Sequence, residues 1–136
     1  MEKINLISIY CGAILLLFMG IFHTQFYKLF GWKNDFEKIS KANKNILHTI
    51  HIALTLIFLG LSAFIFIYVR DLSTSIGVSF GFNIFFSLFW LWRTVWQIFY
   101  FKPHKKNRNH ILHYVLIIYF TLLFIAFIIP PVSKVL

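Results

Sequence analysis

Four long apolar runs constrain this chain more than any other feature of its sequence. Polar stretches separate these runs, which span about 4–22, 46–69, 76–101 and 111–129. A helix needs about 20 mostly apolar residues to cross the hydrocarbon core of a bilayer. The chain is 60% hydrophobic and 12% charged, whereas soluble domains carry about 25% charged residues. The sequence therefore predicts one integral membrane domain over 1–136, an all-α transmembrane four-helix bundle with up-down antiparallel topology.

Basic residues gather in the polar loops that follow the first and third runs. These loops carry Lys28, Lys33, Lys38, Lys41 and Lys44, and Lys102, Lys105, Lys106 and Arg108. In an up-down bundle both loops lie on one side, and the other side has only Lys3, Arg70 and Lys134. Cytoplasmic loops are enriched in Lys and Arg, so we expect a multi-pass protein of the cytoplasmic (inner) membrane with both termini on the non-cytoplasmic side. Contact with anionic lipid headgroups explains the net charge of +9 better than nucleic-acid binding does.

The third run contains a line of polar residues at helical spacing. Phe86 fills one position of this line, and the others are Ser79, Asn83, Trp90, Arg93, Gln97 and Tyr100. Lipid cannot satisfy these groups, so the line should face protein or a water-filled cavity. Arg93 lies about two turns inside the run, and no apolar run offers it a carboxylate. An ionisable residue at this depth indicates a functional site, although the side chain can also snorkel to the interface.

All six histidines fall at the end of the predicted bundle that carries the basic loops. Imidazole is the commonest protein ligand of metals and a usual axial ligand of haem iron. The spacing of His48 and His51, and of His110 and His113, puts each pair on one helical face. The predicted metal or haem ligands are His23, His51, His113, His48 and His110, with cofactor contacts from Arg93, Gln97 and Trp90. The alternative is that the histidines, His104 included, are merely solvated at the interface.

Three functions remain open from the sequence, and whether the protein catalyses a reaction is not decided. The first is a redox protein, or a subunit of a membrane redox complex, that binds haem b or a transition metal ion. The second is a non-catalytic small membrane subunit or assembly partner. The third is a site for a quinone, a lipid or another anionic small molecule. Carboxylates are too sparse for a di-iron centre, which uses several Glu residues.

Smaller motifs predict local structure. Gly77 and Gly81 form a G-x-x-x-G, which permits close helix packing within the chain or in a homo-oligomer. Ser8 and Gly12 belong to a small-residue face of the first run, and Ser40 can cap a helical turn before the second run. We expect Pro130-Pro131 to end the fourth helix, because proline interrupts the helical hydrogen-bond ladder. Cys11 is the only cysteine, so an intramolecular disulfide is excluded.

Several short elements resemble a family of small bacterial four-helix integral membrane proteins. They are Phe22-His23, Phe30-Gly31-Trp32 with Asp35-Phe36, Ile50-His51, Trp92-Arg93 with Gln97-Ile98-Phe99-Tyr100 (an R-x-x-x-Q-x-F-Y element), and His113. We know no assigned function for that family. The resemblance implies a four-helix membrane fold and singles out His23, His51, Arg93, Gln97 and His113 for testing.

Overall fold

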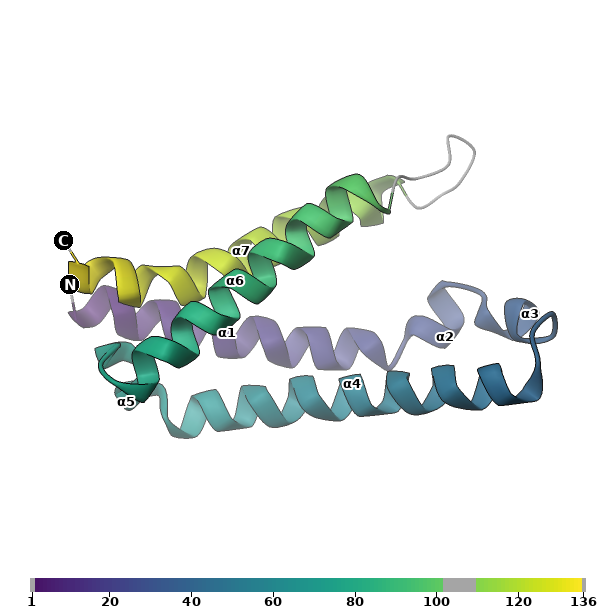
Figure 1. Cartoon of the computed structure of the whole chain (residues 1–136), viewed down its shortest axis with the longest axis horizontal. Helices are drawn as coiled ribbons and strands as arrows, with labels where there is room; N and C mark the ends of the chain where they lie inside the picture. Colours follow the sequence, from purple (N-terminus) through teal and green to yellow (C-terminus); the bar gives the residue numbers. More distant parts are fainter. Residues whose placement is uncertain (1, 102–109, 136) are drawn as a thin grey trace. The chain divides into compact units, whose positions relative to one another are not determined.

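The computed structural model describes residues 2–101 and 110–135, and its regular elements in this part of the chain are all helices (Figure 1). In chain order they are α1 (Glu2–His23), α2 (Phe26–Leu29), α3 (Trp32–Phe36), α4 (Lys41–Ile67), α5 (Val69–Thr74), α6 (Val78–Phe99) and α7 (His110–Val135). Four of them, α1, α4, α6 and α7 from Ile111, are long and apolar enough to cross a membrane. The predicted all-helical chain with four candidate spans is confirmed.

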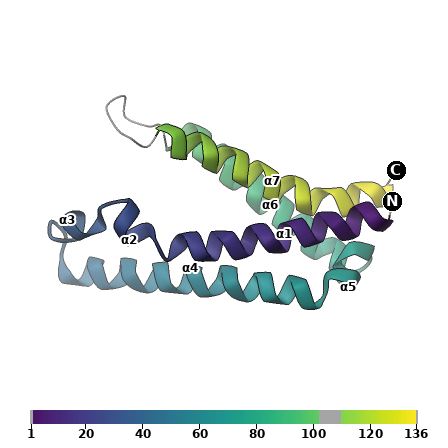
Figure 2. The same cartoon turned by 180° about the vertical axis from the view of Figure 1, so that it is seen from behind.

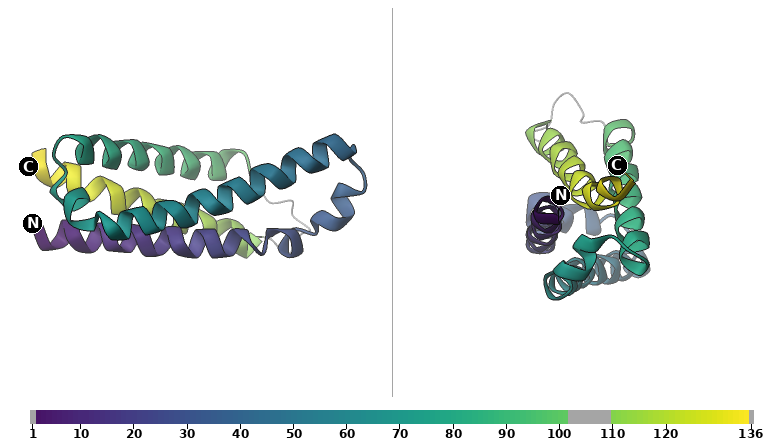
Figure 3. Two further views of the ribbon diagram at one scale, coloured as in Figure 1. Left: turned by 90° about the horizontal axis from the view of Figure 1, so that it is seen from below. Right: turned by 90° about the vertical axis from the view of Figure 1, so that its left-hand side faces the viewer.

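The helices form two compact units. Unit 1 comprises Met1–Gly12 and Ile67–Leu136, and unit 2 comprises Ala13–Phe66. In unit 1, α6 and α7 pair as an antiparallel hairpin (Figure 3). The start of α1 and the end of α7 lie at the same end of this unit, beside α5 (Figures 1 and 2). Helix α1 contributes its first half to unit 1 and its second half to unit 2.

Helix α7 does not end at Pro130-Pro131 but continues through both prolines to Val135, so that prediction was wrong. Pro130 has no N–H, which leaves the carbonyl of Ala126, four residues earlier, without its helical donor. The hydroxyl of Ser8 donates a hydrogen bond to this carbonyl. The close approach of the two helices is possible because Gly12 has no side chain; a Cβ there would lie 3.2 Å from the Phe127 ring.

The corner between α5 and α6 is held by Asn83 and two residues in the left-handed region. Ser75 has φ 50° and Gly77 has φ 57°. The fully buried amide of Asn83 donates to the carbonyl of Leu72 at 2.8 Å. Gly77 therefore serves the turn, while a Cβ on Gly77 or Gly81 would meet nothing within 4 Å. The G-x-x-x-G makes no close helix contact in the described residues, and its use in a homo-oligomer stays a prediction.

In unit 2, the second half of α1 packs closely on α4. Ser62 of α4 donates a hydrogen bond to the carbonyl of Ala13 at 2.8 Å. A Cβ on Gly20 would lie 2.6 Å from Leu59 Cδ2, so a larger residue there forces the Leu59 side chain to shift. Helix α4 begins at Lys41 rather than near 46, because Ser40 caps it directly by accepting a hydrogen bond from the Asn43 N–H at 3.3 Å.

Candidate functional site

The residues proposed from the sequence for a site fall into two groups, which are described separately because they belong to different units. Unit 1 contains Trp90, Arg93, Gln97 and His113, and unit 2 contains His23, His48 and His51. His110 begins α7, but its side chain and the whole of His104 lie outside the described part of the chain.

Helix α6 buries a polar face. Its buried residues follow at steps of four and three, and they are Asn83, Ser87, Trp90, Thr94 and Gln97. The predicted line was correct at Asn83, Trp90 and Gln97. It was wrong at Tyr100, which is exposed, and it also included Ser79, Phe86 and Arg93, which are half-buried. Ser87 and Thr94 belong to the buried face, where each hydroxyl bonds a carbonyl of its own helix. The buried face is thus rotated slightly from the prediction.

Arg93 points its guanidinium at aromatic rings. Its Cζ atom lies 4.5 Å from the ring centroid of Phe120 in α7 and 5.2 Å from that of Phe101. A cation over a ring face is stabilised by the ring quadrupole. Its Nη1 atom is nevertheless buried and has no hydrogen-bond partner. A ring face is a weaker partner for an N–H group than an oxygen acceptor. The contact with the rings therefore does not fully replace the hydrogen bonds to water that the buried Nη1 has lost.

The acidic residues of unit 1 lie at the opposite end of α6 from Arg93. Asp71 belongs to α5, which directly precedes α6, and Glu2 belongs to the start of α1, beside α5. The rise of an α-helix puts Arg93 about 22 Å along the axis from Val78, the first residue of α6. Within the described residues of unit 1, no carboxylate is therefore available to pair with Arg93.

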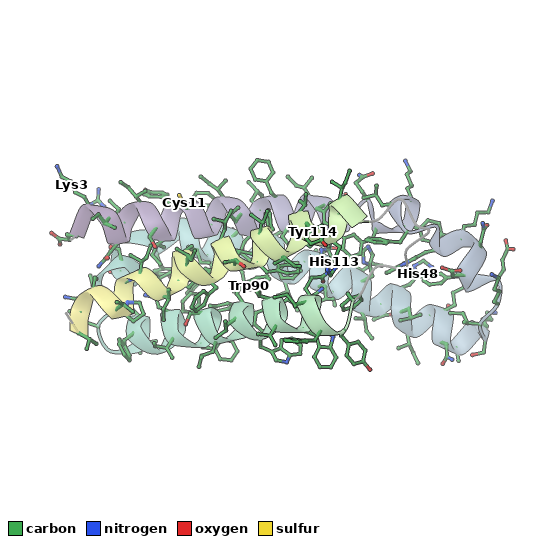
Figure 4. All side chains as sticks on the ribbon, turned by 90° about the horizontal axis from the view of Figure 1, so that it is seen from above. Lys3, Cys11, His48, Trp90, His113 and Tyr114 are labelled. Carbon is green, nitrogen blue, oxygen red and sulfur yellow. The ribbon has the colours of Figure 1, made fainter. Side chains whose placement is uncertain are left out.

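Gln97 lies one turn after Arg93 and connects α6 to α7. Its amide nitrogen lies 3.2 Å from Nδ1 of His113, so the NH₂ group donates, Nδ1 accepts and the neutral ring carries its proton on Nε2. The other amide atom, Oε1, is buried without a partner, and only 4% of the residue surface is exposed. One turn before Arg93, the buried Trp90 stacks on Phe120 with 5.7 Å between ring centroids. Figure 4 marks Trp90 and His113 along this hairpin.

The group in unit 2 is a cluster of stacked rings from four helices. His23 and His51 stack with 5.7 Å between centroids, and the ring of Phe26 stacks on both, at 4.2 Å and 5.5 Å. Trp32 contacts His51 edge to face at 5.1 Å. The Nδ1 atom of His23 lies 3.2 Å from the carbonyl of Met19, so Nδ1 carries the proton and donates.

His48 belongs to the same aromatic region but not to the His23–His51 stack. Its ring stacks on Tyr27 at 5.7 Å and meets Phe36 edge to face at 4.8 Å. The histidines are packed into the aromatic segment of α2 and α3. Aromatic contacts, rather than solvation alone, account for the positions of these side chains.

The described residues include no group of three or more His, Cys, Asp or Glu side chains arranged to hold a metal ion. The histidines of unit 2 that stack on one another number two, His23 and His51. His113 of unit 1 has Gln97 as its neighbour. What the structure does bring together is a cation, an amide and an imidazole on the α6–α7 hairpin.

Sequence reasoning missed Phe120, Ser87 and Thr94. Phe120 is one apolar residue among many in α7, and no signal in the sequence distinguishes it from its neighbours. Ser87 and Thr94 could have been found by extending the helical line in steps of four and three from Asn83. The contacts of the aromatic residues in 26–36 with His48 and His51 were also not predicted.

No family model, curated protein or solved structure matches this chain. The class of protein therefore rests on its four long apolar helices, which indicate a multi-pass membrane protein.

Proposed function

We propose that this chain is a protein of the cytoplasmic membrane, folded as an up-down four-helix bundle with both termini outside the cytoplasm. In this proposal the α6–α7 hairpin binds a small amphiphile with an oxygen acceptor, such as a quinone or an anionic lipid. The orientation is supported by the basic loops after α1 and α6. Anionic headgroups on that side would be the natural contacts of the lysines.

One observation carries the proposal: Arg93 Nη1 and Gln97 Oε1 are both buried without a hydrogen-bond partner on successive turns of one helix. One is a donor and the other an acceptor. Leaving such a group unsatisfied costs about 1–3 kcal/mol. In a candidate membrane span, a ligand oxygen is a natural partner for the guanidinium, because lipid tails offer no acceptor.

The aromatic rings around Arg93 suit a flat ligand. Trp90 and Phe120 are stacked at 5.7 Å, and Phe120 is also the ring that Arg93 approaches most closely. A planar quinone ring could pack beside these rings while a carbonyl oxygen accepts from Arg93. His113 would act through Gln97, because its Nδ1 accepts from the Gln97 amide and so fixes its orientation.

The test is the ligand content of the purified protein. The wild type, Arg93→Gln and the control Arg70→Gln would be purified in mild detergent, and bound quinones and lipids identified by mass spectrometry of an organic extract. Arg70 is exposed and lies in α5. We expect a specific amphiphile with the wild type and the control, and at least a tenfold loss with Arg93→Gln. Equal ligand content in all three, with unchanged helicity, would refute the proposal.

A second candidate is the binding of haem or a transition metal at the histidines, in a redox protein or redox-complex subunit. One observation favours it: His23 donates from Nδ1 to a backbone carbonyl, as metal-ligating histidines commonly do. This arrangement directs the lone pair of Nε2 away from Met19. His23 and His51, which stack on one another in unit 2, would be the ligands.

The absorption spectrum and metal content of the wild type and a His51→Ala variant decide this candidate. A Soret band, or about one equivalent of metal, that the variant lacks would support it. The wild type would be prepared without chelators and then offered haem or metal. If it remains colourless and metal-free, this candidate is refuted. Either result is independent of Arg93.

A further inference from the structure

A second site lies in unit 1, at the far end of α6 from Arg93. It is a pocket of about 330 Å³ at the end of this unit where α1 begins and where α5 and α7 end. Figures 1 and 2 show these helix ends. Its lining residues are Glu2, Asn5, Ser73, Thr74, Ile76, Ser133 and Lys134. This pocket plays no part in the function proposed above.

Asn5 holds the walls of the pocket together. Its amide nitrogen donates to Ser133 Oγ at 2.7 Å and to the carbonyl of Ser73 at 3.3 Å. The residue is 4% exposed, and its Oδ1 lies 3.0 Å from the Ser133 hydroxyl. Helices α1, α5 and α7 are thus joined at one point, so the pocket is formed before any ligand binds.

The rim of the pocket carries one acidic and one basic side chain. Glu2 and Lys134 are both exposed, and within the described residues neither forms a salt bridge. A pocket with two separated and unpaired charges of opposite sign fits a ligand that carries both signs. A ligand with a single charge would satisfy one of these side chains and be repelled by the other.

The position of the pocket indicates where such a ligand comes from. The pocket lies at the ends of the candidate spans α1 and α7 and next to the start of α6. The ends of membrane-spanning helices lie at headgroup level. Ile76 lines the pocket and is 65% exposed, so it offers apolar surface to an acyl chain. A phospholipid headgroup is the zwitterion that is concentrated at this depth.

The chemistry of the lining selects among zwitterionic headgroups. A quaternary ammonium is bound best by aromatic side chains, and none of the residues that line this pocket is aromatic. A primary ammonium instead donates hydrogen bonds to carboxylate and hydroxyl oxygens, which Glu2, Thr74 and Ser133 supply. We propose that the pocket binds a phosphoethanolamine headgroup, with its ammonium at Glu2 and its phosphate at Lys134.

The experiment measures binding of short-chain phospholipids to the delipidated full-length protein in detergent by calorimetry. Dihexanoyl phosphatidylethanolamine would be compared with the phosphatidylglycerol and phosphatidylcholine of the same chains. The variants are Glu2→Gln and Lys134→Gln, and the matched control is Lys3→Gln, an exposed charge that does not line the pocket. All three charges are exposed, so these variants should keep the wild-type helicity and melting temperature.

We expect the wild type and Lys3→Gln to bind the ethanolamine lipid at least tenfold more tightly than the other two lipids. Loss of one charge-assisted contact should weaken this binding about tenfold in each pocket variant. If free glycine displaces the ethanolamine lipid, the roles of Glu2 and Lys134 stand. The ligand is then a soluble zwitterion rather than a lipid headgroup. Equal affinity for the three lipids, or pocket variants that bind like the control, would overturn the proposal. Neither outcome bears on ligand retention at Arg93.

Discussion

Ser8 donates a hydrogen bond to the carbonyl of Ala126, which Pro130 leaves without its helical donor. The two residues are separated by 118 positions in the chain. The bond thus repairs a defect in α7 with a hydroxyl from α1. It compensates for the helical hydrogen bond that Pro130 removes from α7, and it gives the small-residue face of α1 a specific purpose.

This relationship predicts an energetic coupling between Ser8 and Pro130. Ser8→Ala should destabilise the protein by about 0.6–2 kcal/mol, the range for hydrogen bonds between membrane helices. Pro130→Ala restores an N–H that can satisfy the Ala126 carbonyl, so Ser8→Ala should cost much less in that background. The measurement is a double-mutant cycle from unfolding in mixed detergent micelles followed by circular dichroism. The same cost in both backgrounds would contradict this account.

Gly20 should be much less tolerant of a larger side chain than Gly60. Gly20→Val would place a Cβ 2.6 Å from Leu59 Cδ2, whereas a Cβ at Gly60 meets nothing within 4 Å. Overpacking of this kind costs about 1–3 kcal/mol. We expect a lower melting temperature for Gly20→Val than for Gly60→Val. Adding Leu59→Ala should recover part of the loss; no recovery would mean that the contact with Leu59 is not responsible.

We predict that Asn83 stabilises the protein because its side chain donates a hydrogen bond, and not merely because it is polar and of the right size. Its amide nitrogen bonds the carbonyl of Leu72, and a carboxylate cannot donate to that oxygen. We therefore expect Asn83→Asp to lower the melting temperature at neutral pH more than Asn83→Ala does. Stability similar to wild type in Asn83→Asp would show that this bond does not hold the α5–α6 corner.

The proposed membrane orientation predicts which sites react with a membrane-impermeant thiol reagent in intact cells. With Cys11 replaced by serine, a cysteine at Lys134 or Arg70 should be labelled from outside. A cysteine at Lys38 or Lys105 should be labelled only after the membrane is permeabilised, because these positions lie in the basic loops. Labelling of the basic loops in intact cells would reverse the orientation.

The four long helices could be predicted from the sequence because an apolar run of sufficient length has few other structures open to it. The end of α7 could not be predicted from the sequence. The partner of the Ala126 carbonyl is Ser8 of α1, and these two residues meet only in the folded chain. A local rule about proline therefore failed at Pro130.

The site could be predicted in part. Trp90 and Gln97 were placed on the buried face of α6, and the contact of Gln97 with His113 fits their selection as site residues. It was harder to predict exactly which face of α6 is buried, because the hydroxyls of Ser87 and Thr94 form hydrogen bonds within α6 itself. Such residues suit lipid or protein surroundings alike, so their orientation is decided by packing. The grouping of the histidines likewise depends on tertiary contacts.

The sharing of α1 between the two units has a consequence for biosynthesis. Its first half is made first, yet Asn5 and Ser8 find partners at Ser133 and Ala126, near the other end of the chain. Until the ribosome has released α7, these polar side chains lack those partners in a nascent membrane protein. Unit 1 therefore cannot be completed during translation of the first three spans, and a chain truncated before α7 should be a substrate for quality-control proteolysis.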